Sequence, residues 1–159
     1  MITQTLLNQI FCYENGELFW KISPAKQIKI GSKAGNLKPN GYFRVGIGHK
    51  SYAIHRLIFM MHYGYMPTEI DHIDNNPSNN CIENLREANR FQNTQNAIKR
   101  KDCSSGVKGV CWKKSHKKWV VQLQVNGKRK SFGHYNDIEY AKFVADAMRY
   151  KYHKEFSKS

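Results

Sequence analysis

Three asparagine–glycine pairs constrain the fold of this chain more than any other feature of its sequence. Each pair lies beside short runs of aromatic and β-branched residues, and the pairs are Asn15-Gly16, Asn40-Gly41 and Asn126-Gly127. Asn-Gly favours the left-handed backbone of a tight turn, so a pair in this setting predicts a β-hairpin. Short antiparallel strands are therefore expected in both halves of the chain.

The middle of the chain has a different periodicity. Leu57, Ile58 and Met61 recur at helical spacing within residues 55–64, which predicts a helix that ends at Gly64. The elements expected after this helix are a strand, a turn-rich loop, a second strand and a second helix, over residues 69–73, 74–80, 81–85 and 86–100. In the last helix, the candidate buried positions are Ala88, Phe91 and Ala97.

Residues 99–106 are charged or small and form the best linker candidate, which divides the chain into residues 1–100 and 101–159. Beyond the linker we expect three strands and an amphipathic helix. One stripe of that helix is apolar: Ala141, Val144, Ala145 and Met148. The strands alternate, with Val110, Trp112, Trp119, Val121, Leu123 and Val125 facing this helix. The opposite face then carries Lys113, Gln122, Gln124, Arg129 and Ser131.

The net charge of +14 indicates a polyanionic partner. Residues 1–100 hold 12 Lys and Arg against 7 Asp and Glu, whereas residues 101–159 hold 14 against 5. The shorter segment therefore has the higher density of positive charge. No apolar run long enough to span a membrane is present, and the first residues lack the pattern of a secretory signal, so a cytoplasmic protein is expected.

Asp71 and His72 place a carboxylate and an imidazole side by side, directly before a loop rich in asparagine. Hydrolysis of a phosphodiester needs a base to deprotonate water and a cation to stabilise the phosphorane. Imidazole suits the first task because its unperturbed pKa is about 6.5. Carboxylate and amide oxygens suit Mg²⁺. A zinc site formed by His72 and Cys81 is the alternative, although paired cysteine ligands are absent.

The helix expected over residues 86–100 carries three asparagines at spacings of four and three: Asn89, Asn93 and Asn96. Such residues share one face of a helix. One of them is expected to meet Asp71 and complete a metal site. Asp74, in contrast, is interpreted as a turn residue.

Several motifs together resemble the HNH homing endonucleases of phages and introns, which have the ββα-metal nuclease motif. They are HR at 55–56, DHIDNNPSNN at 71–80, ENL at 83–85 and NTQN at 93–96. The resemblance implies that His72 is the general base, that Asp71 and Asn93 bind the metal, and that Asn84 braces the loop and orients the base. It also implies one Mg²⁺ or Mn²⁺ per active site, with Asn96 as the alternative to Asn93. His55 is interpreted as a packing or hydrogen-bonding residue, and Arg56 as a phosphate contact.

Residues 104–156 resemble the APETALA-type DNA-binding domain of plant ethylene-response factors, which has a three-stranded sheet packed on one helix. The resemblance rests on KGV at 108–110, KW at 118–119 and SFGHY at 131–135. It implies that the exposed face of the sheet lies in the major groove of DNA. The DNA-binding residues expected on this basis are Lys108, Lys113, Gln122, Gln124 and Arg129.

The sequence thus predicts an α+β protein. It would contain N-terminal hairpins and a ββα-metal nuclease module, followed by a three-stranded antiparallel sheet on one helix. The predicted function is metal-dependent hydrolysis of double-stranded DNA by a monomer or homodimer, leaving 5′-phosphate and 3′-hydroxyl ends, with no small-molecule substrate. If the protein is encoded by a phage, it would act in the cytoplasm of the host. The alternatives are a DNA-binding regulator with a degenerate nuclease module and an RNA-binding protein.

Overall fold

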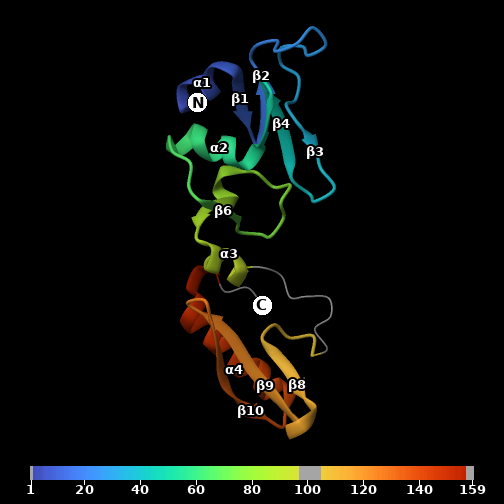
Figure 1. The fold of residues 1–159 in the computed structure, drawn as a ribbon, viewed down its shortest axis with the longest axis vertical. Coiled ribbons are helices and arrows are strands. Elements are labelled where there is room, and N and C mark those ends of the chain that lie inside the picture. Colours follow the sequence, from blue (N-terminus) through green and yellow to red (C-terminus); the bar gives the residue numbers. More distant parts are fainter. Residues whose placement is uncertain (1, 97–104, 157–159) are drawn as a thin grey trace. The chain divides into compact units, whose positions relative to one another are not determined.

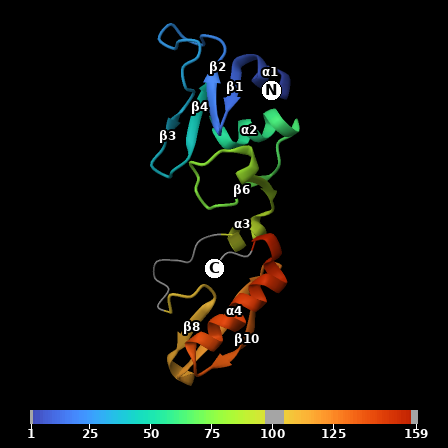
Figure 2. The same ribbon diagram turned by 180° about the vertical axis from the view of Figure 1, so that it is seen from behind.

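The computed structural model describes residues 2–96 and 105–156, apart from the side chain of Glu155. Contacts between residues divide the chain into two compact units, Met1–Ala88 and Asn89–Ser159. Within the described residues, helices and small antiparallel sheets alternate (Figures 1 and 2), which confirms the predicted α+β class. The predicted boundary at residues 100 and 101 stays a prediction, because residues 97–104 lie outside the described part.

The first unit contains three small antiparallel sheets and two α-helices. Its elements are α1 (Gln4–Ile10), β1 (Phe11–Glu14), β2 (Glu17–Trp20), β3 (Asn36–Leu37), β4 (Phe43–Ile47), β5 (Lys50–Ala53), α2 (Ile54–Tyr63), β6 (Glu69–His72), the 3₁₀ turn η1 (Ile82–Asn84) and β7 (Leu85–Ala88). Strand β1 pairs with β2, β3 and β5 flank β4, and β6 pairs with β7. The sequence reasoning missed α1 and β3.

The Asn-Gly turns and helix α2 of the first unit are where the sequence predicts them. Asn15 and Gly16 both have positive φ between β1 and β2, and Asn40-Gly41 lies in the turn between β3 and β4. Helix α2 ends at Gly64, whose left-handed conformation lets its N–H bond the Met60 carbonyl. Leu57 and Ile58 of α2 are fully buried and lie in the centre of the core.

Two of these turns hold the loop that follows β6. A Cβ on Gly16 would lie 2.7 Å from the Cys81 nitrogen, so only glycine permits this approach. Gly41 likewise faces Pro77, and its carbonyl accepts a hydrogen bond from the Ser78 hydroxyl at 2.9 Å. The N-terminal hairpins therefore position the loop next to the candidate site.

The second strand of the β6–β7 pair does not cover residues 81–85, as the sequence predicted. Residues Ile82–Asn84 form the 3₁₀ turn, and the strand begins at Leu85. The Ile82 N–H donates to the Tyr13 hydroxyl at 3.0 Å, and the Asn84 side chain folds back onto the preceding loop. These contacts, one with a residue distant in sequence and the others with the preceding loop, hold the segment as a turn in place of a strand.

The helix predicted over residues 86–100 is also wrong at its start. Its first residues form β7, and α3 begins only at Arg90 and spans Arg90–Asn96. Asn89 caps the helix, because its Oδ1 accepts from the Phe91 and Gln92 N–H groups while the Gln92 side chain accepts from the Asn89 N–H. Ala88 is buried as predicted, but Phe91 is 50% exposed, and Ala97 lies outside the described residues.

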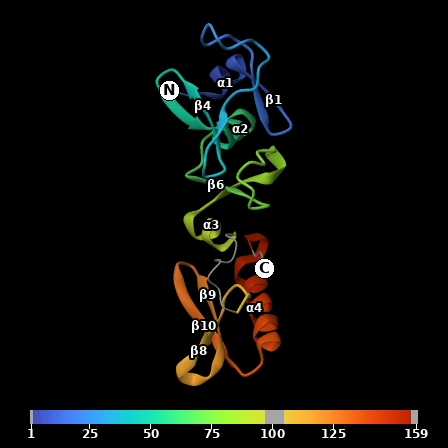
Figure 3. The same ribbon diagram turned by 90° about the vertical axis from the view of Figure 1, so that its right-hand side faces the viewer.

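The second unit contains the predicted three-stranded sheet on one helix. Its other elements are β8 (Val110–Lys113), the 3₁₀ turn η2 (Lys114–His116), β9 (Lys118–Val125), β10 (Lys128–Tyr135), α4 (Ile138–His153) and the 3₁₀ turn η3 (Lys154–Phe156). Strand β9 is central, and α4 covers one face of the sheet (Figure 3). Asn126-Gly127 forms the β9–β10 turn with positive φ at both residues, as predicted.

The pairing register confirms which side chains share a face of this sheet. Val110 and Val121 are paired, and they pack with Ala141 and Ala145 of α4. On the other face, Gln124 is opposite Arg129 and Gln122 is opposite Ser131. Trp112 lies on the inner side next to Trp119, with ring centroids 4.9 Å apart, but it is 41% exposed at the end of its strand.

Candidate active site

Asp71 and His72 lie at the end of β6, and both side chains are buried. The antiparallel register places Asp71 opposite Arg86 and His72 opposite Leu85. Buried charged and polar groups are costly unless they are hydrogen-bonded, so each of these side chains needs defined partners. The two partners described next were not expected from the sequence.

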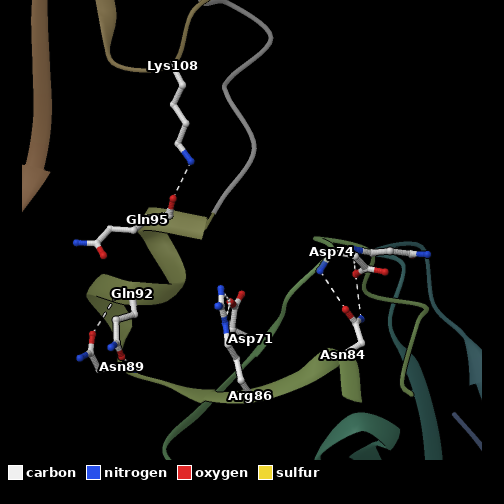
Figure 4. A network of polar contacts seen from close by, with 9 residues as sticks. Asp71, Asp74, Asn84, Arg86, Asn89, Gln92, Gln95 and Lys108 are labelled. Atoms are coloured by element: carbon white, nitrogen blue, oxygen red, sulfur yellow. Dashed lines mark hydrogen bonds and ion pairs between the residues drawn. The ribbon is translucent and has the colours of Figure 1, made fainter. Parts of the chain in front are cut away.

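Arg86 is the charge partner of Asp71 (Figure 4). Its Nε and Nη2 donate to Asp71 Oδ2 at 2.9 and 2.7 Å. The Asp71 side chain is only 4% exposed and that of Arg86 15%, so solvent screens this ion pair weakly. The cross-strand register was the signal that could have revealed Arg86, but it required the correct position of β7.

Asn80 is the hydrogen-bond partner of His72. The His72 Nε2 atom lies 3.2 Å from Asn80 Oδ1, and both side chains are buried. An amide oxygen can only accept, so this contact favours the imidazole tautomer with its proton on Nε2. In that tautomer Nδ1 is the basic nitrogen of the ring.

Two aromatic side chains pack against the His72 ring. The centroid of the His55 ring lies 5.1 Å away, and that of Tyr42 lies 5.8 Å away. Burial, with the nearby His72, Arg56 and Arg44, lowers the pKa of His55 from 6.5 to about 3. His55 is therefore a neutral ring at neutral pH, and it packs against the rings of Tyr42 and His72.

The asparagines of the loop after β6 make its backbone turns. The Asn84 amide donates to Asp74 Oδ1 at 3.0 Å and to the Asn79 carbonyl at 2.8 Å, while its oxygen accepts from the Asp74 N–H (Figure 4). Burial alone would raise the pKa of Asp74, but hydrogen bonds from Asn76, Asn79 and Asn84 lower it. These contacts hold the loop in its turns, while the orientation of the base by Asn84 stays a prediction.

The donor set fits a hard cation that keeps much of its hydration. No group of three or more His, Cys, Asp or Glu side chains gathers within residues 2–96 and 105–156, so a structural zinc site around Cys81 and His72 lacks ligands there. Mg²⁺ needs fewer, because it is often bound by one or two protein oxygens together with water and substrate phosphate. Asp71 supplies such a carboxylate.

The helix-borne metal ligand stays a prediction. Asn93 is half-buried on α3, Asn96 is fully buried, and Asn89 is used as the helix cap. Asn93 and Asp71 belong to different units. The prediction that Asp71 and Asn93 bind one metal ion therefore rests on the sequence alone.

Two of the predicted DNA-contacting residues, Arg56 and Lys108, donate hydrogen bonds to backbone carbonyls outside the sheet of the second unit. Arg56 donates to the Pro67 carbonyl at 2.9 Å, and the Lys108 amine donates to the Gln95 carbonyl at 2.7 Å (Figure 4). Burial, with the positive charge of Arg149, lowers the pKa of Lys108 to about 8. The others lie together on the outer face of the sheet, where Gln122 is half-buried and the rest are exposed: Lys113, Gln122, Gln124 and Arg129.

Comparisons with known proteins show which family the chain belongs to. A family model described as HNH endonuclease matches residues 52–95, which include α2, the β6–β7 pair and most of α3. Protein 3.8 of Escherichia phage T7 is 33% identical over 89 residues, which cover 56% of this chain and 73% of that protein. The chain therefore belongs to the family of Protein 3.8 and carries an HNH endonuclease domain.

A solved structure, of DNA binding and cleavage by the HNH homing endonuclease I-HmuI, is also similar. It matches with a TM-score of 0.42 and 24% identity, over 77% of this chain and 71% of that one.

No helix among the described residues is long and apolar enough to cross a membrane.

Proposed function

We propose that this protein is an endonuclease that hydrolyses double-stranded DNA with the help of a divalent cation. The observation that carries the proposal is the pair of buried side chains at the end of β6. Asp71 and His72 are consecutive residues there, each with a defined partner, within the segment that matches the HNH endonucleases. A carboxylate and an oriented imidazole are the groups that phosphodiester hydrolysis needs.

In the proposed reaction, His72 Nδ1 takes a proton from the attacking water molecule. Asn80 keeps the proton of the imidazole on Nε2, and the rings of His55 and Tyr42 fix its plane. The oxygen of the water then attacks phosphorus while the bond to the 3′-oxygen breaks. The products are a 5′-phosphate and a 3′-hydroxyl. Asn84 contributes by bracing the loop that carries Asn80.

Asp71 and Asn93 would hold one Mg²⁺ or Mn²⁺ ion, with Asn96 as the alternative to Asn93. When bound, the cation neutralises charge that develops on the phosphate and on the leaving oxygen. An amide ligand adds no negative charge, so the electrostatic attraction for the cation comes from Asp71. Weak metal binding in the absence of DNA follows from this donor set.

The second unit would bind DNA through the outer face of its sheet. Lys113, Gln124 and Arg129 are exposed there, and Gln122 lies beside them opposite Ser131. Gln can read adenine, whereas Arg and Lys can read guanine or contact phosphate. Contacts of Arg56 and Lys108 with phosphate remain part of the proposal. The protein would act as a monomer or homodimer in the cytoplasm, which is that of the host if a phage encodes the protein.

The direct test is incubation of supercoiled plasmid with the protein in the presence of Mg²⁺, Mn²⁺ or EDTA. We expect nicked or linear DNA with either cation and none with EDTA. Asp71→Asn, which is nearly isosteric, should remove the metal-dependent cleavage. If the wild-type protein binds the plasmid but leaves it supercoiled with both cations, a DNA-binding regulator describes the protein better.

A further inference from the structure

We propose that Arg86 competes with the metal ion for Asp71, so that the site takes up its cation together with DNA and not before it. This inference rests on the proposed nuclease function and concerns how its metal site is regulated. Arg86 is then a positioning residue with two successive partners. They are the Asp71 carboxylate in the free protein and a phosphate of bound DNA in the loaded site.

The geometry of the ion pair is the first argument. Two N–H groups of the guanidinium converge on a single oxygen of Asp71, at 2.9 and 2.7 Å. Charge-assisted hydrogen bonds of this kind are about twice as strong as neutral ones. A divalent cation bound to the same carboxylate would lie within a few ångströms of the guanidinium and repel it. The carboxylate therefore cannot keep Arg86 in this position and bind the cation at full strength.

Burial is the second argument. Asp71 is nearly inaccessible to solvent, and a buried carboxylate without a counter-charge is strongly unfavourable. In the free protein, Arg86 supplies that counter-charge from the adjacent strand. A cation could take over this role only if the guanidinium finds another partner. The phosphate of DNA is such a partner, because the guanidinium fork matches its oxygens and the same phosphate can also bind the cation.

The experiment measures metal binding by the full chain without DNA. Mn²⁺ titrations followed by electron paramagnetic resonance, with Mg²⁺ as competitor, compare the wild type with Arg86→Gln. Removal of the competing charge-assisted hydrogen bonds should tighten Mn²⁺ binding about tenfold or more. Mn²⁺ should also raise the melting temperature of Arg86→Gln more than that of the wild type.

Two further variants show whether the gain in Mn²⁺ affinity acts through Asp71. The double variant Arg86→Gln/Asp71→Asn should lose this gain in affinity. Arg44→Gln is the matched control, because Arg44 lies in the same unit but donates to Ser51, and it should bind Mn²⁺ like the wild type. Binding by folded Arg86→Gln that equals or falls below that of the wild type would overturn the proposal, since Arg86 would then only support Asp71.

The unaltered protein provides a second test, which holds even if Arg86→Gln does not fold. The NMR signal of the Arg86 Nε–H should move during a Mg²⁺ titration with short duplex DNA, because the guanidinium leaves Asp71. An unchanged signal at saturating Mg²⁺ would contradict the competition. Plasmid cleavage by the wild type decides the nuclease function separately, so the two proposals can fail independently.

Discussion

Acid should destabilise the first unit through His55. The folded state lowers the pKa of His55 from 6.5 to about 3, so between these values the unfolded chain binds more protons than the folded one. The stability that depends on neutral His55 is therefore complete above about pH 6.5 and is lost as the pH falls. At pH 5, about 1.5 units below the ordinary value, the loss amounts to about 2 kcal/mol, because each pKa unit corresponds to about 1.4 kcal/mol.

The assay is urea unfolding at pH 7.5 and pH 5, followed by the NMR signals of α2, which report on the first unit. His55→Phe keeps an aromatic ring but cannot take up a proton, so its loss of stability between the two pH values should be about 2 kcal/mol smaller than that of the wild type. His49→Gln is the control, because His49 is exposed in the turn between β4 and β5. If His55→Phe loses as much stability as the wild type, the buried neutral His55 is not the cause.

Three further predictions concern catalysis and DNA binding. Asn80→Ala should slow single-turnover cleavage about tenfold or more with unchanged DNA affinity, because the catalytic imidazole loses its orienting acceptor, and a wild-type rate would contradict this. In fluorescence titrations, Gln122→Ala or Arg129→Ala should cost about 1–3 kcal/mol of binding free energy on the preferred DNA sequence only. Lys113→Ala should instead weaken binding to all duplexes alike. Equal losses of affinity for every variant on every sequence would refute base reading. A fragment of residues 89–159 should bind duplex DNA with a log–log salt slope of about −0.9 per phosphate contacted, and no affinity at low salt would show that its sheet is only a solvated surface.

Local sequence signals were sufficient for most strands and turns. Asn15-Gly16 and Asn126-Gly127 lie in hairpin turns as predicted, because their left-handed backbone depends on the two residues themselves. The predicted start of the second strand of the β6–β7 pair was wrong, because contacts with other segments hold the residues before Leu85 as a turn. The Tyr13 hydroxyl accepts a hydrogen bond from the Ile82 N–H, and the Asn84 amide donates one to the Asn79 carbonyl in the loop. Neither contact has a signal in the local pattern.

In the candidate site, too, the local sequence revealed some residues, while others are brought together only by the fold. Asp71 and His72 were evident because they are adjacent and precede an asparagine-rich loop. Their partners, Arg86 and Asn80, are distant by 15 and 8 residues, and only the register of β6 with β7 and the path of the loop bring them together. A sequence reveals the types of chemical group in a site more readily than the hydrogen bonds that orient them.

The most direct test of the proposed function is the single-turnover cleavage rate of duplex DNA by the wild type and by His72→Ala in saturating Mg²⁺. DNA affinity and far-ultraviolet circular dichroism are measured on the same samples, to verify that both proteins bind and fold alike. General-base catalysis typically contributes about 10²–10⁴-fold, so the variant should be at least about 10²-fold slower, and the wild-type products should carry 5′-phosphate and 3′-hydroxyl ends. Equal cleavage rates for the two proteins would contradict the assignment of His72 as the base.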